Sequence, residues 1–222
     1  MMNNLFSSFD PSTTMSLSIN WMSAIMGITL MPLIYWLLPS RYTVVVTLLM
    51  NTLHKEFKML LGSNKKEFSM MMVGLFMFIL MNNIMGLLPY VFTSSSHMIF
   101  ALTLALPLWV SFMLFGWINH TKHMLAHMLP NGTPLILMPF MVMIETISNL
   151  IRPSSLAVRL TANMIAGHLL MSLLGNNSTS SGKVALIFIV NIQVGLMMFE
   201  MAVSFIQAYV FSVLSTLYSS EV

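Results

Sequence analysis

The stretch ETISNLIRPSSLAVRLTANMIAGH, from Glu145 to His168, decides how this chain folds. It lies within a segment of about 40 residues, from Leu135 to Leu174, that is apolar enough for a lipid bilayer. Yet Arg159 stands in its middle. An arginine at the centre of a membrane helix costs roughly 2.5 to 3.5 kcal/mol on insertion scales, and other estimates are higher. A cost of that size implies that the side chain has a use.

The composition indicates an integral membrane protein. Of the 222 residues, 57% are hydrophobic and only 7% are charged, whereas charged residues make up about a quarter of a soluble domain. The net charge of +3 is too small and too dispersed for a nucleic-acid partner. The absence of cysteine excludes disulfides and thiolate metal sites. The opening residues, MMNNLFSSFD, resemble neither a signal peptide nor an amphipathic presequence, so we expect no removable targeting segment.

Apolar segments predict an all-α fold that forms a single membrane domain over residues 1–222. A first span is expected over residues 15–38, and two more over 69–91 and 97–119. Each is long enough to cross a hydrocarbon core of about 30 Å. Between the first two, residues 44–61 mix apolar runs with charged side chains, which predicts an amphipathic helix lying on the membrane surface.

Basic residues predict the orientation of these spans. The connection between the second and third spans has no lysine or arginine, and the connection that follows contains Lys122. Five of the nine basic residues fall in the connection between the first and second spans: Arg41, Lys55, Lys58, Lys65 and Lys66. The positive-inside rule therefore places both basic connections on the inner side and the N-terminus outside.

The last third of the chain is predicted to form two unusually long helices, over residues 135–174 and 184–218, joined by the polar segment GNNSTSSGK. At 1.5 Å per residue the first helix would be about 60 Å long, roughly twice the thickness of the bilayer core. Two arrangements compete. Either RPSS, residues 152–155, is a loop between two short spans, or both segments are single helices that lie strongly tilted.

Polar residues recur at intervals of three and four along this region, and the pattern continues through Pro153. Such spacing puts them on one face of a continuous helix, so we expect a hairpin of two tilted helices. The first stripe consists of Glu145, Asn149, Arg152, Leu156, Arg159 and Asn163. The second stripe consists of Gln193, Glu200, Ser204 and Gln207.

Ionisable groups away from the loops are confined to this hairpin: Glu145, Arg152, Arg159, His168 and Glu200. Such groups usually face a partner or a water-filled cavity, and they often mark ion or proton paths. A carboxylate and an imidazole can exchange protons, whereas arginine stays protonated and acts as a fixed charge that attracts a carboxylate. His168 is half a helical turn off the stripe, so it is predicted to face the second helix of the hairpin.

Plainer interpretations stand beside this one. The two glutamates could neutralise the two arginines as structural ion pairs, and His168 could be a packed side chain bonded to a carbonyl. Asn82 and Asn83 are expected to be hydrogen-bonding groups between helices. The histidines at 120, 123 and 127 have the spacing of helical metal ligands, but no carboxylate accompanies them, so we expect an interfacial position and no metal or other cofactor.

Several motifs resemble the subunit a family of mitochondrial F-type ATP synthases. The most specific is SLAVRLTANMIAGHLLMSLLG, with IETISNLIRP before it and FEMAVSFIQAYVFSVLSTLY after it. NNIMGLLPY, LALPLW, GWINHTKHMLAH and NGTPLILMPF are similar to the same family in arthropod-like animals. The resemblance covers nearly the whole chain.

The resemblance implies a proton-conducting stator subunit that couples proton flow to ATP synthesis. Arg159 corresponds to the arginine that faces the rotating ring of c subunits, and Glu145 to the acidic residue of a half-channel open to the matrix. The half-channel from the intermembrane space includes Asn163, His168, Glu200 and Gln207. The remaining stripe residues, Asn149, Arg152, Gln193 and Ser204, form a second tier.

The implied partners are the c-ring, the peripheral stalk, small membrane subunits of the synthase, the lipid bilayer and the transported protons. The implied location is the mitochondrial inner membrane, with the N-terminus towards the intermembrane space and the C-terminus towards the matrix. No phosphate-binding loop is present in the sequence, so nucleotide chemistry is expected elsewhere in this proton-translocating ATPase.

Two other classes of function remain open from the residues alone. A proton-coupled secondary transporter, or a membrane subunit of a respiratory complex, could use the same polar groups. Alternating access would favour an internal repeat, and the sequence shows none. A structural scaffold could use its polar groups only to lock helices together.

Overall fold

The computed structural model of the chain describes residues 5–13, 17–32, 37–62, 66–129 and 134–221. The regular elements of these residues are helices. The α-helices are α1 (Ser23–Thr29), α2 (Arg41–Leu61), α3 (Lys66–Leu87), α4 (Met98–Asn119), α5 (Thr121–His127), α6 (Met138–Ser180) and α7 (Lys183–Glu221). Short 3-10 helices are η1 (Leu5–Phe9), η2 (Ile19–Met22), η3 (Ser94–Ser96) and η4 (Leu135–Leu137).

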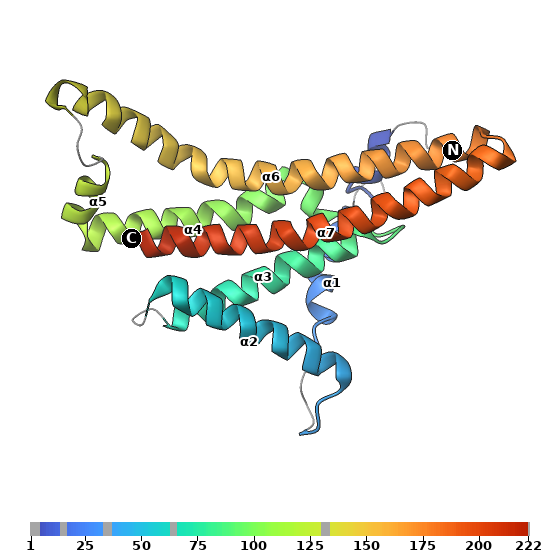
Figure 1. The fold of residues 1–222 in the computed structure, drawn as a ribbon, viewed down its shortest axis with the longest axis horizontal. Coiled ribbons are helices and arrows are strands. Elements are labelled where there is room, and N and C mark those ends of the chain that lie inside the picture. The colour runs from blue at the N-terminus through green and yellow to red at the C-terminus, as the bar shows by residue number, and fades with distance from the viewer. Residues whose placement is uncertain (1–4, 14–16, 33–36, 63–65, 130–133, 222) are drawn as a thin grey trace.

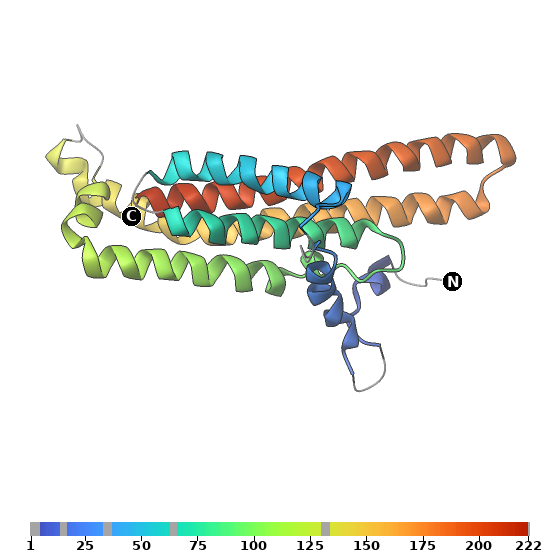
Figure 2. The same cartoon turned by 90° about the horizontal axis from the view of Figure 1, so that it is seen from below.

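Two long antiparallel helices, α6 and α7, run the length of the molecule and meet at a tight turn at one end (Figure 1). The helices α3 and α4 lie along them, and α2 packs obliquely against α3 and α7. The N-terminal segment with η1, η2 and α1 projects to one side of this layer (Figure 2). Among the described residues, α3, α4, α6 and α7 are long and apolar enough to cross a membrane. The chain is thus an all-helical, multi-pass membrane protein.

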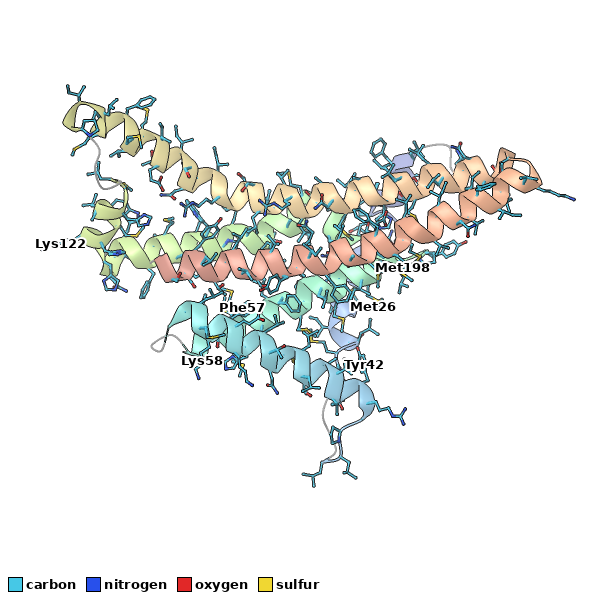
Figure 3. The ribbon with its side chains drawn as sticks, viewed as in Figure 1. Met26, Tyr42, Phe57, Lys58, Lys122 and Met198 are labelled. Carbon is cyan, nitrogen blue, oxygen red and sulfur yellow. The ribbon has the colours of Figure 1, made fainter. Side chains whose placement is uncertain are left out.

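The core draws its buried apolar side chains from α2, α3, α4, α6 and α7, and α3 packs mainly against α7 and α2. Phe57 of α2 is fully buried, and it points towards α3 and α7 (Figure 3). Alanines lie where the helices come closest: Ala101 and Ala105 of α4, Ala157 of α6 and Ala208 of α7 are at most 5% exposed. Small side chains let helix backbones approach closely, and the resulting van der Waals packing is one of the interactions that hold membrane helices together.

The buried face of α7 is polar but satisfied. Its hydroxyl side chains each donate to a carbonyl one turn earlier in the same helix, so burying them leaves no donor unpaired. The residues are Ser204, Ser212, Ser215, Thr216 and Ser219. Asn83 of α3 donates through Nδ2 to the Ser204 carbonyl at 3.5 Å, and Asn82 accepts from Ser94. The interpretation of both asparagines as hydrogen-bonding groups between elements is confirmed.

The continuous-helix interpretation of the first hairpin segment is confirmed, because α6 runs through Pro153 without interruption. The helix bends in its first half (Figure 1), as expected where a proline removes one backbone hydrogen bond. The predicted end at residue 174 is wrong. The helix continues through GNNSTS, because this polar segment contains no proline and its single glycine costs only about 1 kcal/mol before the turn at Ser181 and Gly182.

The predicted first span, residues 15–38, differs most from the structure. Residues 15, 16 and 33–36 lie outside the described residues. In the rest, η2 and the short α1 are followed by non-helical backbone after Thr29. The helix ends there because Pro32 cannot donate a helical hydrogen bond and disfavours helical geometry in the residue before it. In its described part, this segment is too short to cross a bilayer core.

The other boundaries need small corrections. Helix α3 ends at Leu87 and not at residue 91, since Pro89 follows and Tyr90 has a positive φ of 67°. Helix α2 begins at Arg41, earlier than predicted, where the Ser40 side chain caps it by accepting from the Thr43 amide. Helix α4 agrees with the predicted span over 97–119.

Candidate functional site

One face of α6 is left uncovered by the rest of the chain. Arg159, Ala162, Asn163 and Ala166 are all exposed, and their spacing places them on a single side of the helix. The opposite side is packed into the core, where Leu160 is only 1% exposed. The face therefore presents an arginine surrounded by small side chains, a surface that another helix can approach closely.

Among the described residues, no carboxylate forms an ion pair with that arginine. Among the residues that the structure describes, the ion pair observed is between Arg152 and Glu145, and it does not involve Arg159. The charge of Arg159 is therefore uncompensated within the described chain, on a helix of membrane-spanning composition. Because an isolated cation in lipid is so costly, this arrangement needs an anionic partner from outside.

The structural ion pair considered as an alternative is thus present for one of the two arginines. The Arg152 guanidinium donates to Oε1 of Glu145 at 3.4 Å. Both side chains are partly exposed, at 24% and 28%. They lie two helical turns apart, so the arginine must extend along α6 towards its N-terminus to make the contact.

A second carboxylate lies against α6 at the other side of Arg159. Glu200 of α7 approaches Gly167 so closely that a Cβ atom at position 167 would lie 2.7 Å from Oε1. This Oε1 atom is buried and has no hydrogen-bond partner among the described residues. Only glycine at position 167 leaves room for the carboxylate in this position.

The imidazole of His168 contacts other elements than expected. Its ring lies 6.1 Å from the ring of Phe9 in η1 and close to the Gly86 backbone in α3. The prediction that it faces α7 is wrong, because Gly167 occupies that side and each residue turns the helix by about 100°. Its Nε2 atom is buried without a partner among the described residues. Buried polar atoms of this kind usually bind water.

The remaining candidates differ in burial. Gln193, Gln207 and Asn149 are partly exposed, whereas Ser204 is fully buried and bonds to its own helix. In the described part of the chain, no three histidine, aspartate or glutamate side chains are grouped so that they could hold a metal ion.

The two carboxylates lie on opposite sides of Arg159 along α6. At 1.5 Å per residue, Glu145 lies about 21 Å towards the N-terminal end and Gly167, with Glu200 against it, about 12 Å towards the hairpin turn. Neither carboxylate neighbours Arg159. The site therefore has two separate acidic positions with a fixed cation between them.

If the proton path that the resemblance implies runs past Glu200, replacing Gly167 with alanine is expected to leave assembly intact but to lower proton flux on the order of 10- to 100-fold. The new methyl group would displace the Glu200 carboxylate, and small misplacements of transfer groups have effects of this size. Gly175→Ala is the matched control, because nothing lies within 4 Å of a Cβ there. Flux measured in reconstituted vesicles should fall only in the first variant; equal flux in both would contradict the expectation.

Sequence reasoning did not single out Tyr218, which lies over Arg152 at 5.3 Å. A tyrosine near the end of a membrane helix is typical of the aromatic belt at the lipid–water interface, so nothing in the pattern marks it as a site residue. Gly86, whose backbone lies close to His168, carries no sequence signal that marks it as a site residue either. Both contacts join segments that are distant in the sequence.

The chain is similar to proteins of one family over its whole length. The sequence model of the family described as ATP synthase A chain matches residues 12–220. Proteins named ATP synthase subunit a from Drosophila simulans, Anopheles gambiae and Aedes aegypti are 60%, 59% and 60% identical to it. In each case the alignment covers 100% of both chains.

Proposed function

The chain belongs to the ATP synthase A chain family, and from this premise we propose that it is the proton-conducting stator subunit of an F-type ATP synthase. It provides two offset proton half-channels and presents Arg159 to a rotating ring of c subunits. It takes part in ATP synthesis by moving protons, and nucleotide chemistry belongs to other subunits.

The exposed face around Arg159 is the observation that carries the proposal. A permanent cation on a membrane helix, with no carboxylate from the described chain beside it, needs an external anion. The small residues Ala162 and Ala166 allow a partner helix to come close. A ring of helices that each carry one carboxylate meets both requirements, and it can present these carboxylates one after another.

The two acidic positions then serve as entry and exit. Protons enter by way of Glu200 and His168, whose unpaired buried atoms suit a water-filled path. They neutralise a ring carboxylate, which can then rotate into lipid. After nearly a full turn this carboxylate releases its proton towards Glu145 and meets Arg159. A membrane potential supplies about 2.3 kcal/mol per charge per 100 mV to this transfer.

Further polar residues line these paths in the proposal. Asn163 on the Arg159 face and Gln207 on α7 belong to the entry side. Asn149, Arg152, Gln193 and Ser204 act less directly. Of these, Ser204 contributes through packing, since its side chain is fully buried.

The proposed location is the mitochondrial inner membrane, with the surface helix α2 and the C-terminus on the matrix side. Lys58 and Lys122 both lie towards the end of the molecule at which α7 finishes (Figure 3). Basic residues of α2 and α5 on one side agree with an inner, matrix-facing position for that end. The proposed partners are the c-ring, the peripheral stalk and the small membrane subunits.

Membership of the family decides against a secondary transporter or a respiratory-complex subunit. A structural scaffold and a proton path make different predictions for substitutions that remove titratable side chains. A scaffold tolerates uncharged side chains of similar shape, whereas a proton path needs groups that exchange protons.

His168→Gln and Glu200→Gln are each expected to slow proton flux on the order of 100-fold or more, since a positioned proton-transfer group typically contributes about 10²- to 10⁴-fold. The double variant should lose less than the product of the two single losses, because groups that serve one path are coupled. Acid-driven flux into vesicles at equal complex content measures this.

His123→Gln is the control, because His123 is an exposed histidine outside the hairpin. Unchanged flux in both single variants would overturn the proposed path. Losses that multiply strictly would show that the two groups act separately.

A further inference from the structure

The ion pair of Arg152 with Glu145 requires an extended arginine. The two residues lie two turns apart on α6, beyond the three- and four-residue spacing at which helical side chains ordinarily meet. The 3.4 Å contact forms only when Arg152 stretches along the helix. An arginine has many rotamers, and holding one of them has an entropic cost unless other contacts favour it.

The last turns of α7 supply such a contact. The Arg152 guanidinium carbon lies 5.3 Å from the ring centroid of Tyr218, within the range of an attractive cation–π interaction. Tyr218, near the C-terminal end of α7, thus contacts Arg152 in the first half of α6. The delocalised guanidinium can bind a carboxylate at its edge and an aromatic ring at its face simultaneously.

A small cavity lies beside the pair. It measures about 30 Å³ and is lined by Arg152, Tyr218, Asn149, His127 and Trp109 among others, which is room for a water molecule. The Trp109 indole nitrogen is buried without a partner among the described residues. Polar groups from α4, α5, α6 and α7 therefore meet around this arginine.

We propose that Tyr218 is a positioning residue for proton release: its ring holds Arg152 in the extended conformation that reaches Glu145. This inference rests on the proposed role of Glu145 as the exit carboxylate. Tyr218 does not touch the proton. It acts through Arg152, which sets the position and charge environment of the carboxylate.

Three variants test this: Tyr218→Phe, Tyr218→Leu and Arg152→Gln, together with the double variant Tyr218→Leu/Arg152→Gln. Phenylalanine keeps the aromatic face, so its proton flux should stay within about twofold of wild type. Leucine removes it, and the flux should fall about 2- to 10-fold. The double variant should be no slower than Arg152→Gln alone, because the ring acts only through the arginine.

Tyr209→Leu is the matched control. Tyr209 lies on the same helix, but its hydroxyl donates to Glu56 of α2 at 3.2 Å and takes no part in this pair. Flux is compared at equal content of assembled complex. Where Tyr218→Leu lowers that content, Tyr218→Met fills the space of the ring without a π face and is expected to show the same loss.

A Phe variant as slow as the Leu variant would overturn the inference, as would a double variant whose losses multiply. Wild-type flux in both Tyr218→Leu and Tyr218→Met would overturn it as well. Arg159→Ala, measured in the same preparation, separates this from the proposed function. If Arg159→Ala abolishes ATP synthesis while the Tyr218 variants behave as wild type, the inference alone fails. If Arg159→Ala makes ATP normally, the proposed function fails.

Discussion

Replacing Arg159 with alanine is expected to give an assembled complex that makes no ATP yet conducts protons passively. The fixed cation has two roles between the acidic positions. It attracts the arriving ring carboxylate, since an opposite charge within about 4–6 Å favours the ionised form. It also repels protons that would otherwise pass directly from the entry path to the exit path. Alanine removes both effects.

Passive proton permeability of membranes stripped of the catalytic head measures this leak, at matched complex content. A reagent that modifies the ring carboxylate should block it. Lys183→Ala, which removes an exposed cation beside the hairpin turn, is the control and should leave membranes tight. A tight membrane in the assembled Arg159→Ala complex would refute the barrier role. It would favour a structural arginine instead.

Arg159→Lys is expected to lose ATP synthesis nearly as completely as Arg159→Ala, by roughly 100-fold or more if breaking a desolvated charge pair is the guide. Lysine keeps a positive charge, but its ammonium is more strongly hydrated and can lose its proton when desolvated. It also lacks the planar fork that binds a carboxylate through two parallel hydrogen bonds.

ATP synthesis driven by an imposed proton gradient measures this loss. Lysine conserves the positive charge and much of the side-chain length. The loss in the lysine variant therefore measures the contribution of the guanidinium shape separately from that of the charge. Synthesis at the wild-type rate in the lysine variant, at normal assembly, would contradict the expected need for a guanidinium.

The sequence predicted most of the fold because apolar length and polar spacing are local properties. The continuity of α6 through Pro153 followed from the polar stripe, and it is confirmed. The same reasoning failed in the described part of residues 15–38 and at 174, where helix ends depend on single residues. Pro32 ends the first helix early, whereas the polar residues after Leu174 do not end theirs.

The sequence by itself determined that this is a membrane protein and which of its helices are long. It also determined that the two long helices contain Arg159 together with a few proton-exchanging groups. Only the tertiary structure decided which of these side chains meet. Helical spacing predicts the face of a residue on its own helix, but not the element that packs there. Hence Glu200 lies against Gly167, His168 turns to α3 and η1, and Tyr218 covers Arg152. Each contact joins segments far apart in the chain, and their distance is set by packing, which no local pattern records.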